Sequence, residues 1–205
     1  MTEATVHLAV YDTFSDWEVG HVTAHINNPL WHRTPGRFGV RTVGAGTEPV
    51  TSMGGLRVTP DVTLADLRPS DSAMLILPGS NIFATGAFTP FVAKAREFLD
   101  AGVPVAAICG ATGALATAGL LDNRPHTSNA VEFLAGLGYA GKDFYRNEPA
   151  VTDGDLITAS GVAPVEFARA IMARLDVYEP DVLASWYKLY GQHDPAGFME
   201  LAAVR

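Results

Sequence analysis

Short apolar runs alternate with helical stretches along most of the chain, and this alternation limits the fold more than any other feature. Such runs are typical of strands buried on both faces of a parallel sheet, with the helices as crossover connections. The sequence therefore predicts an α/β fold, a three-layer sandwich with a mostly parallel sheet and helices on both faces. We expect strands at residues 6–11, 38–43, 73–77 and 103–108, and helices at 16–28, 91–99, 110–121, 129–137 and 164–175. A hairpin is expected at 151–158, and a hairpin or an edge excursion at 53–58.

The chain is predicted to form one domain, residues 1–205, with residues 179–205 as a C-terminal helical extension. A length of 205 residues suits a single domain, and a 48% hydrophobic composition can fill a large core. We expect the extension to form an amphipathic helix that packs on the body or on a partner subunit. Apolar surface around Trp186 and Tyr187, together with the 53–58 hairpin, predicts a homodimer.

Charge and composition exclude several classes of partner. A net charge of −8 argues against nucleic acid or an anionic membrane surface. The uncharged stretch 101–121 has about the 20 residues that a membrane helix needs, but it contains Pro104 and four glycines, so we expect a buried strand and helix there. The start of the chain has no basic region typical of a signal peptide, and a single cysteine cannot form an intrachain disulfide. These features indicate a cytoplasmic protein.

Cys109 is the candidate nucleophile. It stands in Val103-Pro-Val-Ala-Ala-Ile-Cys109-Gly110-Ala-Thr-Gly113, where a buried strand ends and a helix begins. A nucleophile elbow has this layout, because its strained turn requires small neighbouring residues. The helix amides and dipole favour the thiolate, which predicts a thiol pKa below the ~8.5 of a free cysteine. The alternative is a buried structural cysteine, the usual state of an isolated one.

Two further segments end near the same edge of the predicted sheet. Gly79 and Ser80 follow one strand, and their backbone N–H groups could join that of Gly110 in an oxyanion hole. Glu18 follows the first strand, near the start of a helix for which Ser15 and Asp16 are possible N-caps. An acid there usually only complements the helix dipole. Beside the sulfur, however, an ionised Glu18 would raise the thiol pKa, so we expect the pair to share one proton.

Together these segments resemble the ThiJ/PfpI superfamily, the glutamine amidotransferase-like branch that includes the Parkinsonism-associated protein deglycase. The resemblance runs from the first strand to the segment at residues 159–168. It implies a flavodoxin-like sandwich that is commonly dimeric. It also implies that Cys109 is the elbow nucleophile, Glu18 the conserved acid, and Gly79-Ser80 the oxyanion turn.

The sequence departs from this family pattern in its histidines. Many members carry His directly after the cysteine, where this chain has Gly110. Others carry His in a segment after the elbow helix, and the best match here places Asn129 at that position. His126 would reach the pocket only if that loop were shifted. No later His-x-Glu pair is present, so glutamine hydrolysis is not expected.

Metal binding is a weak alternative. His21 and His25 stand four residues apart on the first predicted helix, one turn beyond Glu18, which is a conceivable metal-binding spacing. Such pairs often arise by chance, and we expect neither a metal nor another cofactor.

These residues predict a cysteine-dependent enzyme that acts on a small electrophile. The sulfur would attack a reactive aldehyde or dicarbonyl, in a glyoxalase III-like or deglycase-like hydration or hydrolysis, with Glu18 as the proton partner. One alternative is an isonitrile hydratase-like enzyme, although those hydratases usually carry Asp where Glu18 stands. The other is a redox-sensing or stress protein in which Cys109 is oxidised.

Overall fold

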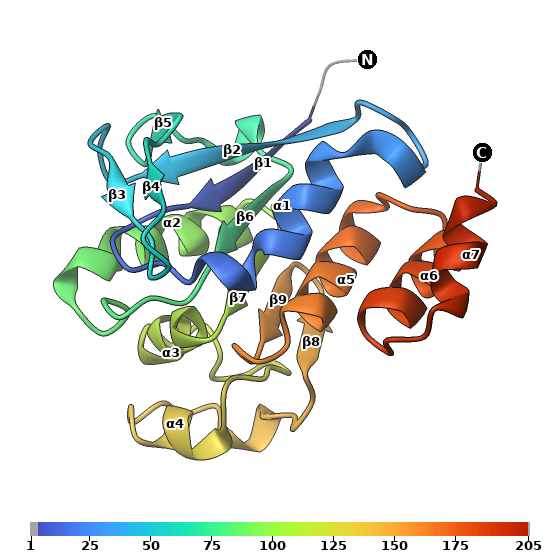
Figure 1. Cartoon of the computed structure of the whole chain (residues 1–205). Coiled ribbons are helices and arrows are strands. Elements are labelled where there is room, and N and C mark those ends of the chain that lie inside the picture. Colours follow the sequence, from blue (N-terminus) through green and yellow to red (C-terminus); the bar gives the residue numbers. More distant parts are fainter. Residues whose placement is uncertain (1–3, 205) are drawn as a thin grey trace.

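The computed structural model describes residues 4–204 and has a flavodoxin-like α/β fold (Figure 1). A seven-stranded sheet has the order β5-β2-β1-β6-β7-β9-β8, and β8 alone among these strands runs antiparallel to its neighbour. The central strands are buried on both faces, as their apolar runs predict. The strands of this sheet are β1 Ala4–Ala9, β2 Phe38–Gly44, β5 Val62–Thr63, β6 Met74–Leu77, β7 Val105–Ile108, β8 Ala150–Asp153 and β9 Leu156–Ala159.

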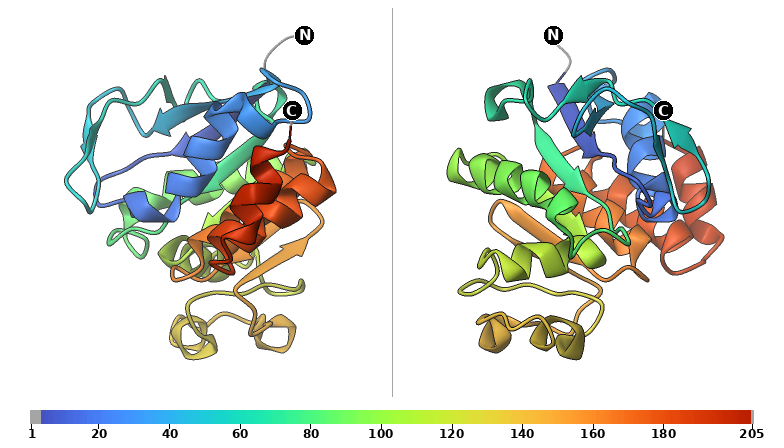
Figure 2. Two further views of the ribbon diagram at one scale, coloured as in Figure 1. Left: turned by 45° about the vertical axis from the view of Figure 1, so that its right-hand side comes forward. Right: turned by 90° about the vertical axis from the view of Figure 1, so that its left-hand side faces the viewer.

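Helices cover both faces of the sheet, as expected. α1 and α5 pack against each other on one face, whereas α2 and α3 pack together on the other (Figure 2). The α-helices of the body are α1 Gly20–Asn27, α2 Thr89–Asp100, α3 Gly110–Thr117, α4 Val131–Ala135 and α5 Pro164–Leu175. Short 3₁₀ turns are η1 Asp16–Glu18, η2 Pro29–Trp31, η3 Pro69–Asp71, η4 Gly86–Phe88 and η5 Lys142–Phe144. Within the described residues no helix is both long and apolar enough to span a membrane.

The first predicted helix is divided, and its predicted caps are wrong. Residues 16–18 form the turn η1, and α1 begins only at Gly20. Neither Ser15 nor Asp16 caps a helix with its side chain. The Asp16 carboxylate instead accepts hydrogen bonds from the Ser52 hydroxyl and, at 3.0 Å, from the Gly54 N–H. These donors lie in the hairpin of strands β3 Val50–Thr51 and β4 Arg57–Val58, which begins three residues before the hairpin expected at residues 53–58.

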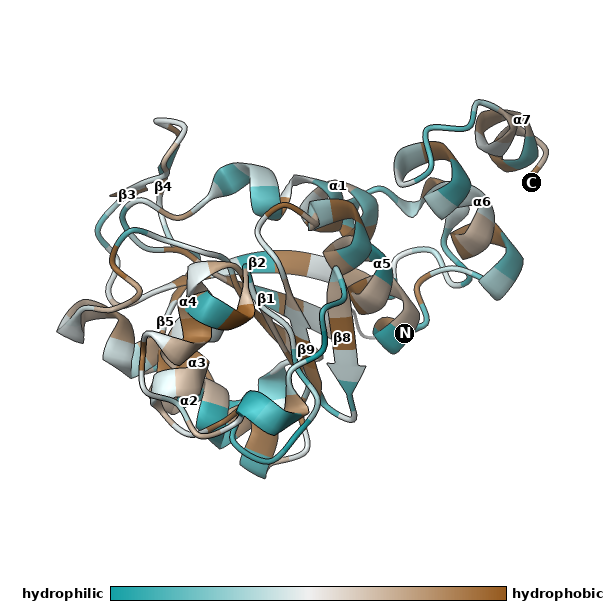
Figure 3. Cartoon of the chain, turned by 90° about the horizontal axis from the view of Figure 1, so that it is seen from below, coloured by the Kyte–Doolittle hydropathy of each residue, from teal (hydrophilic) through white to brown (hydrophobic). Residues whose placement is uncertain are grey.

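The C-terminal extension differs from its prediction in two ways. It forms two helices, α6 Pro180–Tyr190 and α7 Ala196–Ala202, which lie at one end of the molecule beyond α5 (Figure 3). The break between them contains His193 with a positive φ of 56°, followed by Pro195. Trp186 is fully buried, so it cannot supply the exposed dimer surface that the sequence suggested. On the β3–β4 hairpin, by contrast, Met53 and Leu56 are 42% and 59% exposed.

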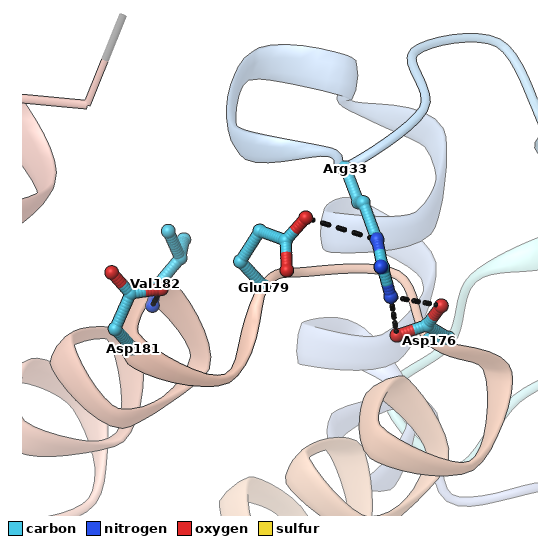
Figure 4. A network of polar contacts seen from close by, with 5 residues as sticks. All are labelled: Arg33, Asp176, Glu179, Asp181 and Val182. Atoms are coloured by element: carbon cyan, nitrogen blue, oxygen red, sulfur yellow. Dashed lines mark hydrogen bonds and ion pairs between the residues drawn. The ribbon is translucent and has the colours of Figure 1, made fainter.

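Aromatic contacts and one arginine hold the extension against the body. The Trp186 ring lies 5.2 Å from the ring of His25 on α1, and the Tyr178 hydroxyl lies 3.1 Å from His25 Nδ1. Arg33 pairs with Asp176 at 2.6 Å and with Glu179 at 2.9 Å, across the junction of α5 and α6 (Figure 4). The ion pairs are exposed and contribute little. The extension therefore depends mainly on its buried aromatic contacts.

His25 makes the stability of this contact sensitive to acid. Burial, reinforced by the neighbouring His21 and His32 rings, lowers the pKa of His25 from an ordinary 6.5 to about 4. Between these pH values the unfolded chain binds a proton that the folded chain does not. The contribution of neutral His25 to the free energy of unfolding is therefore fully present above pH 6.5 and is lost as the pH falls to about 4. At about 1.4 kcal/mol per pKa unit, we expect a loss of about 3 kcal/mol.

Urea unfolding of the wild type and of His25→Phe between pH 7 and pH 4 measures this loss. The variant should show a shallower fall in the free energy of unfolding. His193→Asn is the control, because His193 is exposed. Equal slopes for the wild type and His25→Phe would contradict the assignment.

Candidate active site

Cys109 occupies a sharp turn between the last residue of β7 and the first residue of α3. Its backbone has φ 58° and ψ −128°, a strained conformation for a residue with a side chain. Two glycines make room for it. A Cβ on Gly161 would lie 2.7 Å from the sulfur, and one on Gly79 would lie 2.8 Å from the Cys109 Cβ. This is the elbow geometry that the small flanking residues predict.

Glu18 is fully buried beside this turn, and only one of its two carboxyl oxygens accepts a hydrogen bond. The Gly79 N–H donates to its Oε2 at 2.6 Å, whereas Oε1 has no hydrogen-bond partner among residues 4–204. A Cβ on Gly79 would lie within 3.0 Å of both carboxyl oxygens as well as close to Cys109. Glycine at this position therefore lets the carboxyl group and the cysteine approach each other. A buried carboxyl oxygen without a hydrogen-bond partner costs free energy of folding.

The expected oxyanion hole is only partly available. The Gly79 N–H is already donated to Glu18, so Gly79 cannot serve a substrate oxygen as the sequence suggested. The Ser80 hydroxyl donates to the Asp12 carbonyl and accepts from the Ile82 N–H. No hydrogen bond within the described residues uses the backbone N–H of Ser80. Of the three expected donors, Gly110 directs its N–H at the sulfur and lowers the pKa of the Cys109 thiol, so only the Ser80 N–H has no such contact.

Burial raises the pKa of both groups of the pair, and repulsion from Glu18 adds to the shift at Cys109. Burial and the nearby Glu18 carboxylate raise the pKa of the Cys109 thiol, while the Asn129 amide and the Gly110 N–H act in the opposite direction. Burial also raises the pKa of Glu18, against the hydrogen bond from Gly79. The prediction of a thiol pKa below that of free cysteine is therefore wrong, because the helix N-terminus does not outweigh desolvation.

Asn129, rather than His126, lies at the sulfur. Its Nδ2 donates to Cys109 Sγ at 3.3 Å, and its Oδ1 accepts from the Gly161 N–H at 2.8 Å, which fixes the amide orientation. His126 is buried elsewhere in the loop, with Nδ1 at 2.8 Å from the Arg124 carbonyl and Nε2 at 3.3 Å from the Tyr139 hydroxyl. The expectation that His126 could line the pocket is not met, because these contacts hold its ring away from the cysteine.

Comparisons with known proteins give the family to which the chain belongs. The model of the DJ-1/PfpI family matches residues 4–174, a span that includes Glu18, Gly79, Cys109 and Asn129. The chain belongs to the DJ-1/PfpI family.

Several relatives cover nearly the whole chain. "Uncharacterized protease YoaZ" of Bacillus subtilis is 40% identical over 98% of this chain and 97% of its own length. A thiJ/pfpI family protein from Bacillus anthracis is 41% identical, with a TM-score of 0.92 over 100% of this chain and 98% of that one. The DJ-1 superfamily protein Atu0886 from Agrobacterium tumefaciens is 33% identical, with a TM-score of 0.82 over 93% and 99% of the two chains.

Three residues of this DJ-1/PfpI site were not singled out from the sequence. Gly161 follows β9 at the same edge of the sheet as Gly79, and the same argument from a strand ending in glycine could have found it. Tyr11 is buried with its hydroxyl donating to the Pro78 carbonyl, and burial together with Glu18 raises its pKa. Phe83 lies 3.0 Å from where a Cβ on Gly110 would stand. A side chain after the cysteine would therefore meet this ring.

The two helical histidines take no part in this site. His21 and His25 lie with their rings stacked 6.2 Å apart, next to Trp186. No group of three or more metal-binding side chains occurs within residues 4–204.

Proposed function

We propose that this chain is a cysteine-dependent enzyme that acts on a small electrophile, such as a reactive aldehyde or dicarbonyl. The observation that carries the proposal is the unpartnered Oε1 of buried Glu18, beside the strained turn of Cys109. Because Oε1 has no hydrogen-bond donor of its own, it can accept the proton of the nearby Cys109 thiol. The expected chemistry is a glyoxalase III-like or deglycase-like hydration or hydrolysis.

The raised pKa values define how the thiol would be activated. At neutral pH the sulfur rests as a thiol rather than as a free thiolate. As Sγ attacks the electrophilic carbon, its proton passes to Glu18 Oε1, and Glu18 can later return it to the product. Asn129 Nδ2 donates to the sulfur as negative charge develops. The oxygen of the attacked carbonyl is expected to accept a hydrogen bond from the Ser80 N–H, the expected oxyanion donor that has no partner within residues 4–204.

Addition to a carbonyl fits the site better than cleavage of an amide. Two relatives carry the word protease in their names. Amide cleavage, however, requires a proton donor for the departing amine, usually a histidine. No hydrogen bond joins a histidine to Cys109 or Glu18 within residues 4–204. Hydration of a carbonyl or of an isonitrile needs no such leaving group.

Turnover of methylglyoxal tests the proposal against the redox-sensor alternative. We expect catalytic consumption of methylglyoxal, and only slow loss of the thiol at a stoichiometric dose of peroxide, because a protonated thiol reacts poorly with peroxide. Isonitrile hydration is assayed in parallel. Rapid stoichiometric oxidation of Cys109 without turnover of any electrophile would assign the protein to redox sensing.

We also propose that the protein acts as a cytoplasmic homodimer. A reducing compartment such as the cytoplasm keeps Cys109 in its thiol form. With Trp186 buried, the expected dimer surface rests on the β3–β4 hairpin, whose Met53 and Leu56 are among the exposed large apolar side chains of the chain. We expect light scattering at micromolar concentration to give twice the 21.7 kDa chain mass, and Leu56→Asp to shift it toward the monomer. A monomeric wild type would refute the dimer.

A further inference from the structure

A buried tyrosine contacts the candidate site through a backbone peptide group. Tyr11 lies just beyond the end of β1 and is 3% exposed. Its ring packs edge-on against the rings of Phe88 and Phe91, with centroids 4.9 Å and 4.8 Å away. These contacts fix the ring, and its hydroxyl donates a hydrogen bond to the Pro78 carbonyl. Within the described residues, no other hydrogen bond is made to that carbonyl.

The same peptide group also holds Glu18. The Pro78 carbonyl and the Gly79 N–H belong to one planar trans peptide unit, on which they point in nearly opposite directions. The carbonyl accepts from the Tyr11 hydroxyl, and the N–H donates to Glu18 Oε2 at 2.6 Å. Two hydrogen bonds therefore join hydroxyl, peptide and carboxyl group in series. We call this arrangement the Tyr11–peptide–Glu18 chain.

Hydrogen bonds in series strengthen one another. A donor to the carbonyl oxygen draws electron density from the peptide nitrogen, so the N–H on the other side becomes a better donor. Here the N–H donates to a carboxyl group, and a stronger donor favours the ionised form of that group. The Tyr11 hydroxyl thus strengthens the contact that stabilises the Glu18 carboxylate.

The Gly79 N–H is the main support of ionised Glu18. Burial raises the pKa of Glu18, and the Gly79 N–H is the strongest influence against that rise, ahead of the Cys109 thiol and the Ser15 hydroxyl. A change in the donor strength of this one N–H therefore changes how readily Glu18 ionises.

Few other titratable groups act on Glu18. Within the described part of the chain, those that face it are Cys109, from the elbow, and Tyr11 itself. Asp16, on the same turn as Glu18, binds the β3–β4 hairpin instead. Burial, together with Glu18 and Cys109, raises the pKa of Tyr11, so its hydroxyl keeps its proton and stays a donor.

Other contacts hold the turn after β6 in place independently of Tyr11. The Ser15 N–H donates to the Gly79 carbonyl at 2.9 Å, and the Ser80 hydroxyl donates to the Asp12 carbonyl at 3.1 Å. Removing the Tyr11 hydroxyl should therefore leave the turn where it is. What changes is the polarisation of the peptide group.

We propose that Tyr11 is a positioning residue of this site, which acts on Glu18 through the Pro78–Gly79 peptide and favours the carboxylate form. Its contribution to turnover rests on the proposed function, because only a carboxylate can accept the thiol proton. Its effect on the ionisation of Glu18 does not depend on any reaction.

Titration of Glu18 tests the proposal without turnover. The isotope-labelled carboxyl carbon of Glu18, assigned with Glu18→Gln, is followed by NMR against pH in the Cys109→Ser protein, where no thiol titrates beside it. We expect Tyr11→Phe to raise the midpoint by about 0.5 pH unit, roughly a threefold change in the acid equilibrium, because one hydrogen bond in a series alters the next by about 10–30%.

Tyr178→Phe is the matched control. Tyr178 is also 3% exposed, and its hydroxyl lies in a buried hydrogen bond of 3.1 Å with His25. Its ring contacts His25, Trp31 and His32. Loss of this hydroxyl should leave the Glu18 midpoint unchanged. A midpoint that is unchanged or lower in Tyr11→Phe, or that rises equally in both variants, would overturn the proposal.

A modified tyrosine should shift the midpoint in the opposite direction. With meta-fluorotyrosine in place of Tyr11, the more acidic phenol donates more strongly, so Glu18 should ionise at lower pH than in the unmodified protein. A loosened structure cannot produce this fall. The measurement therefore decides the proposal by itself if Tyr11→Phe does not fold, and a midpoint that stays the same or rises would contradict it.

Turnover gives a separate readout. With Cys109 present, the acid limb of kcat/KM on methylglyoxal should move to higher pH in Tyr11→Phe, since Glu18 must be ionised to accept the thiol proton. An unshifted limb would overturn the role of Tyr11 in turnover. Absence of turnover in the wild type would refute the proposed function, and the titration of Glu18 in Cys109→Ser would still decide whether Tyr11 acts on the carboxyl group.

Discussion

Cys109→Ser is expected to lower kcat/KM on the true electrophile by about a thousandfold or more. Cys109 is the single cysteine of the chain, so no other thiol can substitute for it. A serine hydroxyl has a far higher pKa than a thiol, and in this buried site Glu18 would have to remove a much less acidic proton. A thousandfold loss corresponds to about 4 kcal/mol of transition-state stabilisation.

The fold of this variant should be intact, since serine is close to cysteine in size and keeps the strained turn. Thermal unfolding within a few degrees of the wild type checks this. Cys109→Ala is the companion variant, because a similar loss in both shows that the serine hydroxyl supplies no chemistry. If Cys109→Ser retained more than about a tenth of the activity, the sulfur could not be the nucleophile.

Elements defined by local signals were predicted well. α5 runs from Pro164 to Leu175, as expected, because Pro favours the first turn and Asp176 ends the helix with a positive φ of 55°. The hairpin around Asp153-Gly154 was likewise recognisable from its turn residues. The elbow at Cys109 was predictable because the geometry demands small residues that a packed cysteine would not need.

Features that depend on distant contacts were not predictable. η1 separates from α1 because Asp16 binds the β3–β4 hairpin, which is more than thirty residues away in the chain. β5 has only two residues, too few for a periodic signal. The extension divides into α6 and α7 at His193 and Pro195, although its apolar residues suggested one continuous helix.

The candidate site was likewise predictable only in part. Glu18, Gly79 and Cys109 come together because parallel strands end at one edge of the sheet, which the order of elements already implies. The choice of Asn129 over His126 depends on how the loop packs on Tyr139, and no local pattern encodes that contact. The sign of the thiol pKa shift depends on burial and on the closeness of Glu18, neither of which a sequence measures.

Glu18→Gln is expected to separate ionisation of the thiol from catalysis. Removing the carboxylate removes the repulsion that helps to raise the pKa of Cys109, so the thiol should ionise at lower pH than in the wild type. Gln can accept the Gly79 N–H through its oxygen and turn its amide N–H toward the sulfur, which further favours the thiolate. Turnover should nevertheless fall by about 10²–10⁴, because an amide cannot accept the thiol proton.

The pH dependence of alkylation by iodoacetamide measures the first effect, and turnover measures the second. With the carboxylate present, reactivity of the wild type should rise only as the pH approaches the raised thiol pKa. In Glu18→Gln the same rise should move to lower pH. Glu18→Asp is the control, since it keeps the charge on a side chain one methylene shorter, and its thiol should ionise at higher pH than that of Glu18→Gln.

A merely structural role for Glu18 predicts a different result. Loss of the Gly79 contact would loosen the elbow and impair turnover, but it would not lower the thiol pKa while the sulfur stays buried. A Glu18→Gln thiol that ionises at the same or higher pH than the wild type would therefore show that the carboxylate does not face Sγ. Unchanged turnover in that variant would remove Glu18 from the mechanism altogether.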